Sequence, residues 1–231
     1  MNSTYNQIPG IQLFDDGVNP TIASPYSPFS ISFYLTRKDS EDPELYQSFL
    51  KDAIREFRRS RVYKHYKGQL IDIGLNRDQM HSDLTSDMVN LEMHHNILTI
   101  YDIAVIISEH ILNTVGHITT FDLIYFLRMA HTQHQVQVVM LSLTEHQLLH
   151  NTEDVFIHPN MCFGKWWEFL ELYHTGITKG IARKLITRIE RSMGTDVSTD
   201  GELSRLREKI KDWSGMNGYG YNENITMPTA Y

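Results

Sequence analysis

Two pairs of histidines give this sequence its clearest chemical pattern. His94 and His95 are adjacent in LEMHH, and His146 and His150 are four residues apart in SLTEHQLLHN. Residues four apart on a helix share one face, so the imidazoles of His146 and His150 can both reach one metal ion. Adjacent residues at a strand end point to opposite sides of the backbone. One of the first pair can therefore complete a three-histidine metal site, while its neighbour stands beside the metal to accept a proton.

The segments that carry these histidines favour two strands and a helix. Residues 87–93 alternate loosely, and residues 137–141 are rich in β-branched side chains, as expected of strands. Residues 142–151 follow directly, and Ser142 and Glu145 have the spacing of a capping box at a helix start. An order of strand, strand and helix would bring the four histidines together.

Helices are predicted on both sides of the second strand. Residues 97–113 and 119–134 have helical periodicity, and Thr119 or Thr120 is expected to cap the second of these helices. They form an insertion, residues 98–135, which must pack against the strands if the two strands are to meet. Residues 42–67, 163–176, 178–194 and part of 199–231 are also predicted to be helical, the first as one amphipathic helix with a basic end.

Composition is that of a globular chain. The 231 residues are 41% hydrophobic and 21% charged, and no apolar run is long enough to cross a membrane. Cys162 is the one cysteine, so no intrachain disulfide can form, and we expect a cytoplasmic protein without a secretion signal. The formal net charge of −7 argues against a protein that coats nucleic acid through its whole surface, but it is compatible with a local basic face.

With their order and spacing, LEMHH and QVVMLSLTEHQLLH resemble the HNH, or ββα-metal, nucleases, and within them the colicin-type DNases. The resemblance implies that His94, His146 and His150 bind one divalent metal ion, Zn²⁺ or Mg²⁺. It implies that His95 is the general base, and Glu92 matches the acidic residue that often precedes the histidine pair.

The sequence departs from the family pattern at two points. Gln137 stands nine residues before His146, where the family has an asparagine that ties the finger loop together and helps to orient the base. We expect the amide of Gln137 to take this catalytic role. The segment between His95 and Gln137 is also much longer than the family's loop. Asp102 is interpreted either as an acceptor that fixes the tautomer of a ligand histidine or as an ordinary helix acid.

The predicted fold class is α+β and mostly α-helical, with a small ββα-metal finger, an inserted helical hairpin and flanking helices. The predicted divisions are an extended or irregular segment (1–44), a basic amphipathic helix and connector (45–83), the ββα-metal domain with its insertion (84–175), C-terminal helices (176–213) and a flexible tail (214–231).

The function implied by the resemblance is a metal-dependent endonuclease that hydrolyses phosphodiester bonds with low sequence specificity, on DNA in preference to RNA. If the chain is encoded by a phage, the expected location is the host cytoplasm. The candidate phosphate contacts are Arg55, Arg58, Arg59, Lys179, Arg183, Lys184 and Arg188. The alternative hypothesis is a non-catalytic, zinc-stabilised finger that binds a protein partner through the helical insertion. We expect no membrane contact in either case.

Overall fold

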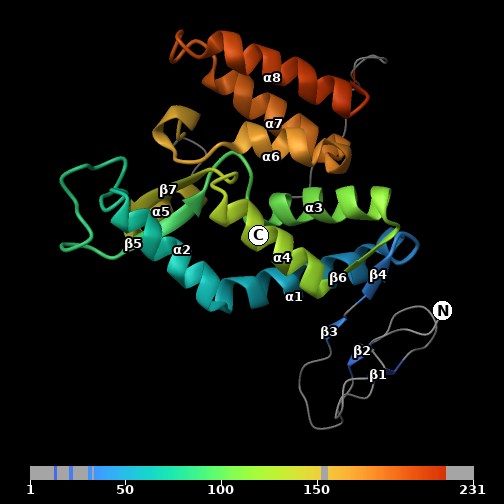
Figure 1. Ribbon diagram of the computed structural model, residues 1–231. Helices are drawn as coiled ribbons and strands as arrows, with labels where there is room; N and C mark the ends of the chain where they lie inside the picture. The colour runs from blue at the N-terminus through green and yellow to red at the C-terminus, as the bar shows by residue number, and fades with distance from the viewer. Residues whose placement is uncertain (1–12, 15–20, 23–30, 33, 152–155, 217–231) are drawn as a thin grey trace. The chain divides into compact units, whose positions relative to one another are not determined.

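The structure is a computed structural model, and the residues that it describes are 13–14, 21–22, 31–32, 34–151 and 156–216. Within this part of the chain the fold is α+β and mostly helical, with eight α-helices and short antiparallel strands (Figure 1). The predicted fold class is thereby confirmed. Contacts between Cα atoms divide the chain into two units, residues 1–176 and residues 177–231, which are described separately.

The first unit contains the strands and most of the helices. Its helices are α1 (Pro43–Arg59), α2 (Arg61–Asp72), α3 (Ile100–Thr114), α4 (Thr120–Thr132), α5 (Leu143–Asn151) and α6 (Trp166–Leu172). Its strands are β1 (Leu13–Phe14), β2 (Thr21–Ile22), β3 (Ile31–Ser32), β4 (Tyr34–Thr36), β5 (Leu91–His95), β6 (His117–Thr119) and β7 (Val138–Ser142). Among the described residues they form antiparallel sheets in the orders β1-β2-β3, β4-β6 and β5-β7.

Ser60 divides the first helical segment into α1 and α2. Its backbone is extended, with φ −64° and ψ 151°. The Ser60 hydroxyl donates a hydrogen bond to the carbonyl of Phe57 (2.6 Å) and accepts one from the amide of Tyr63 (3.2 Å). One side chain therefore serves the end of α1 and the start of α2. The structure differs here from the single helix predicted for residues 42–67.

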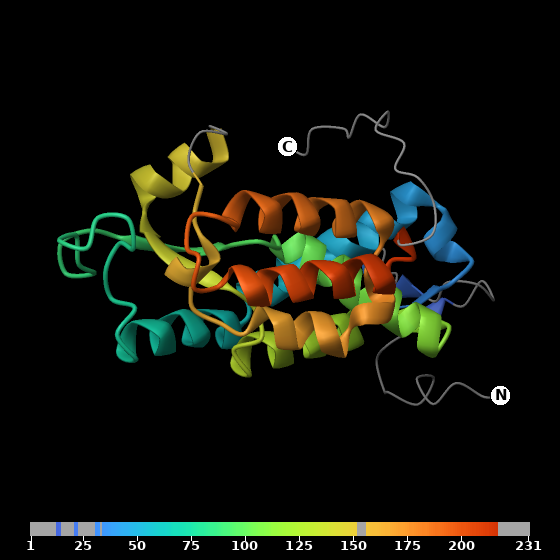
Figure 2. The same cartoon turned by 90° about the horizontal axis from the view of Figure 1, so that it is seen from above.

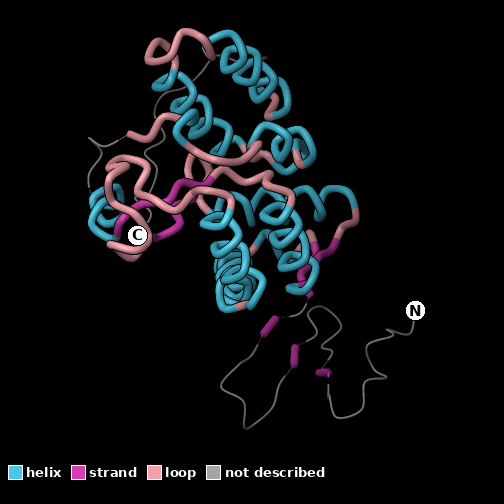
Figure 3. Tube along the Cα trace, turned by 60° about the vertical axis from the view of Figure 1, so that its left-hand side comes forward, coloured by secondary structure: helices cyan, strands magenta, loops and turns pink. Residues whose placement is uncertain are grey.

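β5 and β7 are paired although two helices separate them in the sequence. Met93 of β5 lies opposite Met140 of β7, and α3, β6 and α4 form the connection between the strands. Figure 3 shows the two strands side by side. α5 follows β7 directly, and the hydroxyl of Ser142 accepts a hydrogen bond from the amide of Glu145 (3.4 Å). The predicted order of strand, helical insertion, strand and short helix is present.

The core of the first unit lies where α1, α3 and α4 pack against one another. A fully buried aliphatic or aromatic side chain contributes about 1.5–3 kcal/mol to folding, so this shared interior fixes the insertion against α1. Gly176 ends the segment that packs on α3, and a Cβ there would lie only 1.9 Å from the carbonyl oxygen of Ile106. Buried side chains of the three helices include Phe49, Ala53, Phe57, Ile103, Ile107, Leu123 and Leu127.

The second unit is a pair of helices, α7 (Lys179–Ser192) and α8 (Asp200–Trp213). They pack side by side, as Figure 2 shows, and an ion pair of 3.5 Å joins Arg207 of α8 to Glu190 of α7. Among the described residues, no helix combines the length and the apolar character that a membrane crossing requires.

Candidate functional site

Strand alternation places the two adjacent histidines on opposite faces of β5. Met93 and His95 are buried on one face, and Glu92 and His94 are half-buried on the other. Because successive side chains of a strand point in opposite directions, His94 and His95 have different neighbours and different chemistry. The sequence predicts this separation, but the histidine that enters the core is His95.

His94 lies next to one of the two helix histidines. The ring centroids of His94 and His146 are 5.2 Å apart, with an angle of 74° between the rings. The backbone of His150 belongs to α5, but its side chain is not among those that the structure describes. Among the described residues, no group of three or more histidine, cysteine, aspartate or glutamate side chains is arranged to hold a metal ion. The three-histidine site and its divalent ion therefore stay a prediction.

His95 forms a hydrogen bond with a second buried histidine, His131 of α4. The Nε2 atoms of the two rings are 2.9 Å apart, and Nδ1 of His131 lies 2.7 Å from the carbonyl oxygen of Leu127. Because a carbonyl only accepts, Nδ1 of His131 carries the proton. Its Nε2 therefore accepts the Nε2–H of His95, and this geometry assigns a neutral tautomer to each ring.

Aromatic side chains surround this histidine pair and exclude water from it. The ring centroid of His131 is 4.8 Å from that of Phe57 and 5.4 Å from that of Tyr66. Burial lowers the pKa of His131 to about 4. Burial, and next the neighbouring His131, hold the pKa of His95 well below 6.5. Both imidazoles are therefore neutral near pH 7, and neither is placed to exchange protons with solvent.

Gln137 and Asn96 hold the loop around residues 157–162 against the strands. Nε2 of Gln137 donates to the carbonyl of Pro159 (2.8 Å), and Nδ2 of Asn96 donates to the carbonyl of Ile157 (3.2 Å) and to Sγ of Cys162 (3.2 Å). Gln137 and Asn96 are buried. Gln137 thus ties a loop together, and no signal in the sequence had pointed to Asn96.

The other predicted site residues lie in several places. Asp102 forms a capping box with Thr99, whose amide donates to its carboxylate (2.8 Å). Arg55 and Arg59 face carboxylates of their own helix, at 2.6 Å from Asp52 and 3.7 Å from Glu56. Arg58 also belongs to α1, whereas the remaining four predicted phosphate contacts belong to α7, in the second unit: Lys179, Arg183, Lys184 and Arg188.

A groove that the sequence did not reveal lies on the insertion. We call it the aromatic groove. It has a volume of about 470 Å³ and is bounded by the end of α3, by β6, by the first turns of α4 and by the end of α6. The ring centroids of Tyr173 and His110 are 5.3 Å apart. Its lining residues are His110, Ile111, Thr114, Val115, His117, Asp122, Phe126, Leu172 and Tyr173.

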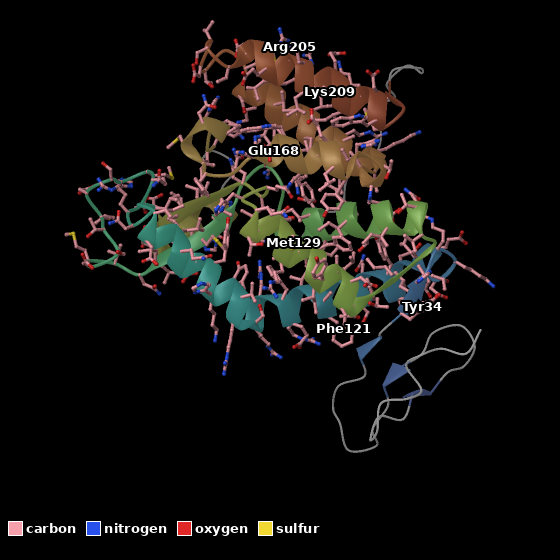
Figure 4. All side chains as sticks on the ribbon, viewed as in Figure 1. Tyr34, Phe121, Met129, Glu168, Arg205 and Lys209 are labelled. Carbon is pink, nitrogen blue, oxygen red and sulfur yellow. The ribbon has the colours of Figure 1, made fainter. Side chains whose placement is uncertain are left out.

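Large apolar side chains are exposed at this groove and beside it. Val115 and Leu172, which line it, are 59% and 51% exposed, and Tyr125 on the adjoining turn of α4 is 55% exposed. Phe121, near the N-terminal end of the same helix, is 60% exposed. In Figure 4 the labels Phe121 and Met129 identify α4. Exposed large apolar side chains at a concave surface are a feature of sites of association.

Comparison with known proteins overturns the resemblance to nucleases. The model of the Bacteriophage G278-like virion protein family matches residues 22–213, which is most of the chain. No curated protein and no solved structure matches the chain. A virion protein family conflicts with the predicted HNH endonuclease, so that identification and the predicted hydrolase activity are wrong. The catalytic roles of His95 and Gln137, which were part of that activity, are not retained.

The physical reason for the error is that the motif is formed by generic elements. An antiparallel strand pair followed by a helix positions side chains in the same way with or without metal chemistry, and histidines four residues apart are frequent in a chain with 12 of them. The match over residues 22–213 includes β5, the insertion, β7 and α5 together with the helices around them. The chain belongs to the Bacteriophage G278-like virion protein family.

Proposed function

We propose that this protein is a structural component of the bacteriophage virion and that it binds another virion protein through the aromatic groove. The observation that carries the proposal is the exposed apolar surface of Val115, Tyr125 and Leu172 around a concave groove. Family membership supplies the setting, because partners of a virion protein are found in the assembled particle. The location that we infer is the virion, in place of the host cytoplasm.

The composition of the groove suits a protein partner. Aromatic side chains are enriched in protein interfaces, where they bury a large area at a small cost in side-chain entropy. Tyr173 and Phe126 form the apolar floor, with ring centroids 6.4 Å apart. His110 and Asp122 add polar atoms at the edge, which can fix the orientation of a bound segment.

The groove lies largely on the helical insertion, which the alternative hypothesis assigned to a protein partner. α3, β6 and α4 supply most of its lining, and all three fall within residues 98–135. These elements are fixed against α1 by a buried core, so the groove is presented on a rigid support. A preformed apolar surface binds a partner with a small cost in ordering.

The test is the incorporation of the protein into virions. Phage lacking this gene would be complemented with the wild-type gene or with a Val115→Glu, Tyr125→Glu double variant, and the protein would be quantified in purified particles by mass spectrometry. Because carboxylates do not bury against an apolar partner, we expect incorporation to fall about tenfold or more.

The matched control is Met88→Glu. Met88 is 68% exposed, lies in the loop before β5 and does not line the groove. We expect this variant to enter virions at the wild-type level. Equal incorporation of the double variant and the wild type, with both proteins folded by circular dichroism, would exclude the groove as the attachment surface.

A further inference from the structure

A second concave surface lies between α2 and the end of α4. We call it the α2–α4 cleft. Its volume is about 630 Å³, and both helices belong to the first unit. It shares no lining residue with the aromatic groove. Its lining residues are Arg61, Val62, His65, Gln69, Asp72, Ile73, Arg128, Thr132 and His134.

Two arginines of the α2–α4 cleft have no carboxylate partner among the described residues. Arg61 begins α2, Arg128 belongs to α4, and both are exposed. Some arginines of the same unit do pair, among them Arg37, 2.6 Å from Glu109, and Arg55, 2.6 Å from Asp52, whereas Arg58 and Arg77 have no carboxylate partner among the described residues. In a chain with 28 acidic and 21 basic residues, cations that lack a partner at a concave surface indicate complementarity to an external anion.

His134 forms part of the wall in a conformation that costs free energy. Its φ is 56°, in the left-handed region that glycine or asparagine normally occupies after a helix. A non-glycine residue in that region is strained. Its ring lies 5.0 Å from the ring of Phe163 and 6.0 Å from that of Tyr66, and its Nδ1 is buried without a hydrogen-bond partner among the described residues. The same conformation closes α4, because the amide of Gln135 donates to the carbonyl of Ala130 (2.9 Å).

We propose that the α2–α4 cleft binds a carboxylate-bearing segment of a protein partner. The planar guanidinium groups of Arg61 and Arg128 match the geometry of carboxylates, which accept two parallel N–H donors. Val62 and the 57% exposed Ile73 supply apolar contacts for the side chains beside those carboxylates. The ligand is thus an acidic segment that also carries apolar residues. This goes beyond the proposed function, since it assigns a second surface and a different partner chemistry.

The observations favour a peptide over nucleic acid. Nucleic acid is held by many cations spaced along its backbone, whereas the lining of the cleft has two arginines and one acid, Asp72. The net charge of −7 repels a long polyanion. It repels a short segment less, because the carboxylates of that segment contact the arginines directly. The apolar residues Val62 and Ile73 also offer no favourable contact to the polar sugar-phosphate backbone of nucleic acid.

The test measures binding to the full chain by fluorescence anisotropy. The probe is a fluorescein-labelled peptide of alternating glutamate and leucine, and its matched control has glutamine in place of glutamate. The cleft variant is the double substitution Arg61→Gln, Arg128→Gln. The control variant is the double substitution Arg55→Gln, Arg59→Gln, which removes the same charge from arginines outside the cleft. An oligothymidylate of equal charge serves as the nucleic-acid probe.

We expect the glutamate peptide to bind the wild type at least about tenfold more tightly than the glutamine peptide. The cleft variant should bind the glutamate peptide about tenfold more weakly than the wild type. The dissociation constant of the control variant should stay within about twofold of the wild-type value. Equal losses in the two variants, or no binding of the glutamate peptide, would overturn the proposal. Tighter binding of the oligothymidylate would identify nucleic acid as the ligand instead. None of these outcomes depends on incorporation into virions, so the aromatic groove is tested separately.

Discussion

Burial gives the imidazole of His131 a pKa of about 4, below the value of 6.5 for an ordinary histidine. The unfolded chain therefore binds a proton near pH 6.5, and the folded chain binds it only near pH 4. Between these values the unfolded state holds more protons, so the free energy of unfolding decreases as the pH falls. A core that contains a neutral histidine pair is stable at neutral pH and becomes sensitive to acid.

We predict that urea unfolding reports this loss directly. Between about pH 6.5 and pH 4 the free energy of unfolding should fall by up to about 3 kcal/mol through His131 alone. In a His95→Leu, His131→Leu double variant, both partners are replaced by apolar groups, and the slope between about pH 6.5 and 5 should flatten. If the free energy of unfolding depends on pH as steeply in the double variant as in the wild type, the histidine pair is not the cause of the acid sensitivity.

The amide of Gln137 supports a second prediction at this scale. Its hydrogen bond to the carbonyl of Pro159 is 2.8 Å long and buried. The shorter Gln137→Asn side chain should lose this bond and leave its own buried amide unpaired, while the carbonyl of Pro159 keeps the amide of Cys162 (3.1 Å). We expect a loss of about 1–3 kcal/mol in the free energy of unfolding. Gln133→Asn, at the exposed end of α4, is the control and should change stability by less than about 0.5 kcal/mol. Similar free energies of unfolding for the two variants would show that the loop of residues 157–162 does not depend on Gln137.

At the scale of the elements, local signals in the sequence identify the helices but not the face that each side chain presents. The hydroxyl of Thr119 caps α4 as predicted, because its bond to the amide of Asp122 depends only on residues three apart. Alternation likewise separates His94 from His95. Which of the two is buried depends on α4, which brings His131 to that side, and no local pattern contains that information.

The break at Ser60 and the pairing of β6 show the same limit. Ser60 had a sequence signal, since serine is a preferred N-cap, but the amphipathic pattern continues across it. β6 is only three residues long and is paired with β4, far away in the sequence, so its strand conformation comes from a tertiary contact. The aromatic groove also depends on such contacts, because it combines the ends of α3 and α6.

Two glycines give opposite predictions for the same substitution. A Cβ at Gly176 would lie 1.9 Å from the carbonyl oxygen of Ile106, whereas a Cβ at Gly68 of α2 meets nothing within 4 Å. Gly176→Ala should therefore push the backbone away from α3 and lower the free energy of unfolding by about 1–3 kcal/mol. Gly68→Ala should raise it by about 0.5–1 kcal/mol, because alanine restricts the unfolded chain. Thermal unfolding measures both, and a shift of the same sign in the two variants would contradict the close approach of Gly176 to α3.

At the scale of the whole molecule, two surfaces of different chemistry lie on the first unit. The aromatic groove is apolar with polar edges, and the α2–α4 cleft has two arginines and a strained imidazole. A protein of a virion family with two such surfaces can contact two partners of different composition. The net charge of −7 belongs to the same interpretation, because it disfavours general binding to nucleic acid and leaves recognition to the local surfaces.

The last prediction concerns DNA cleavage. Purified protein incubated with supercoiled plasmid and Mg²⁺ or Zn²⁺ should leave the plasmid intact on an agarose gel. His95 donates its ring proton to His131 within the core, so it is not placed to activate a water molecule at a phosphate. Nicking that disappears with EDTA and also in a His95→Ala variant would contradict this expectation and restore the nuclease hypothesis. Nicking that persists in His95→Ala would instead point to a contaminating nuclease or to a different active centre, because the imidazole of His95 is the base that the HNH pattern supplies.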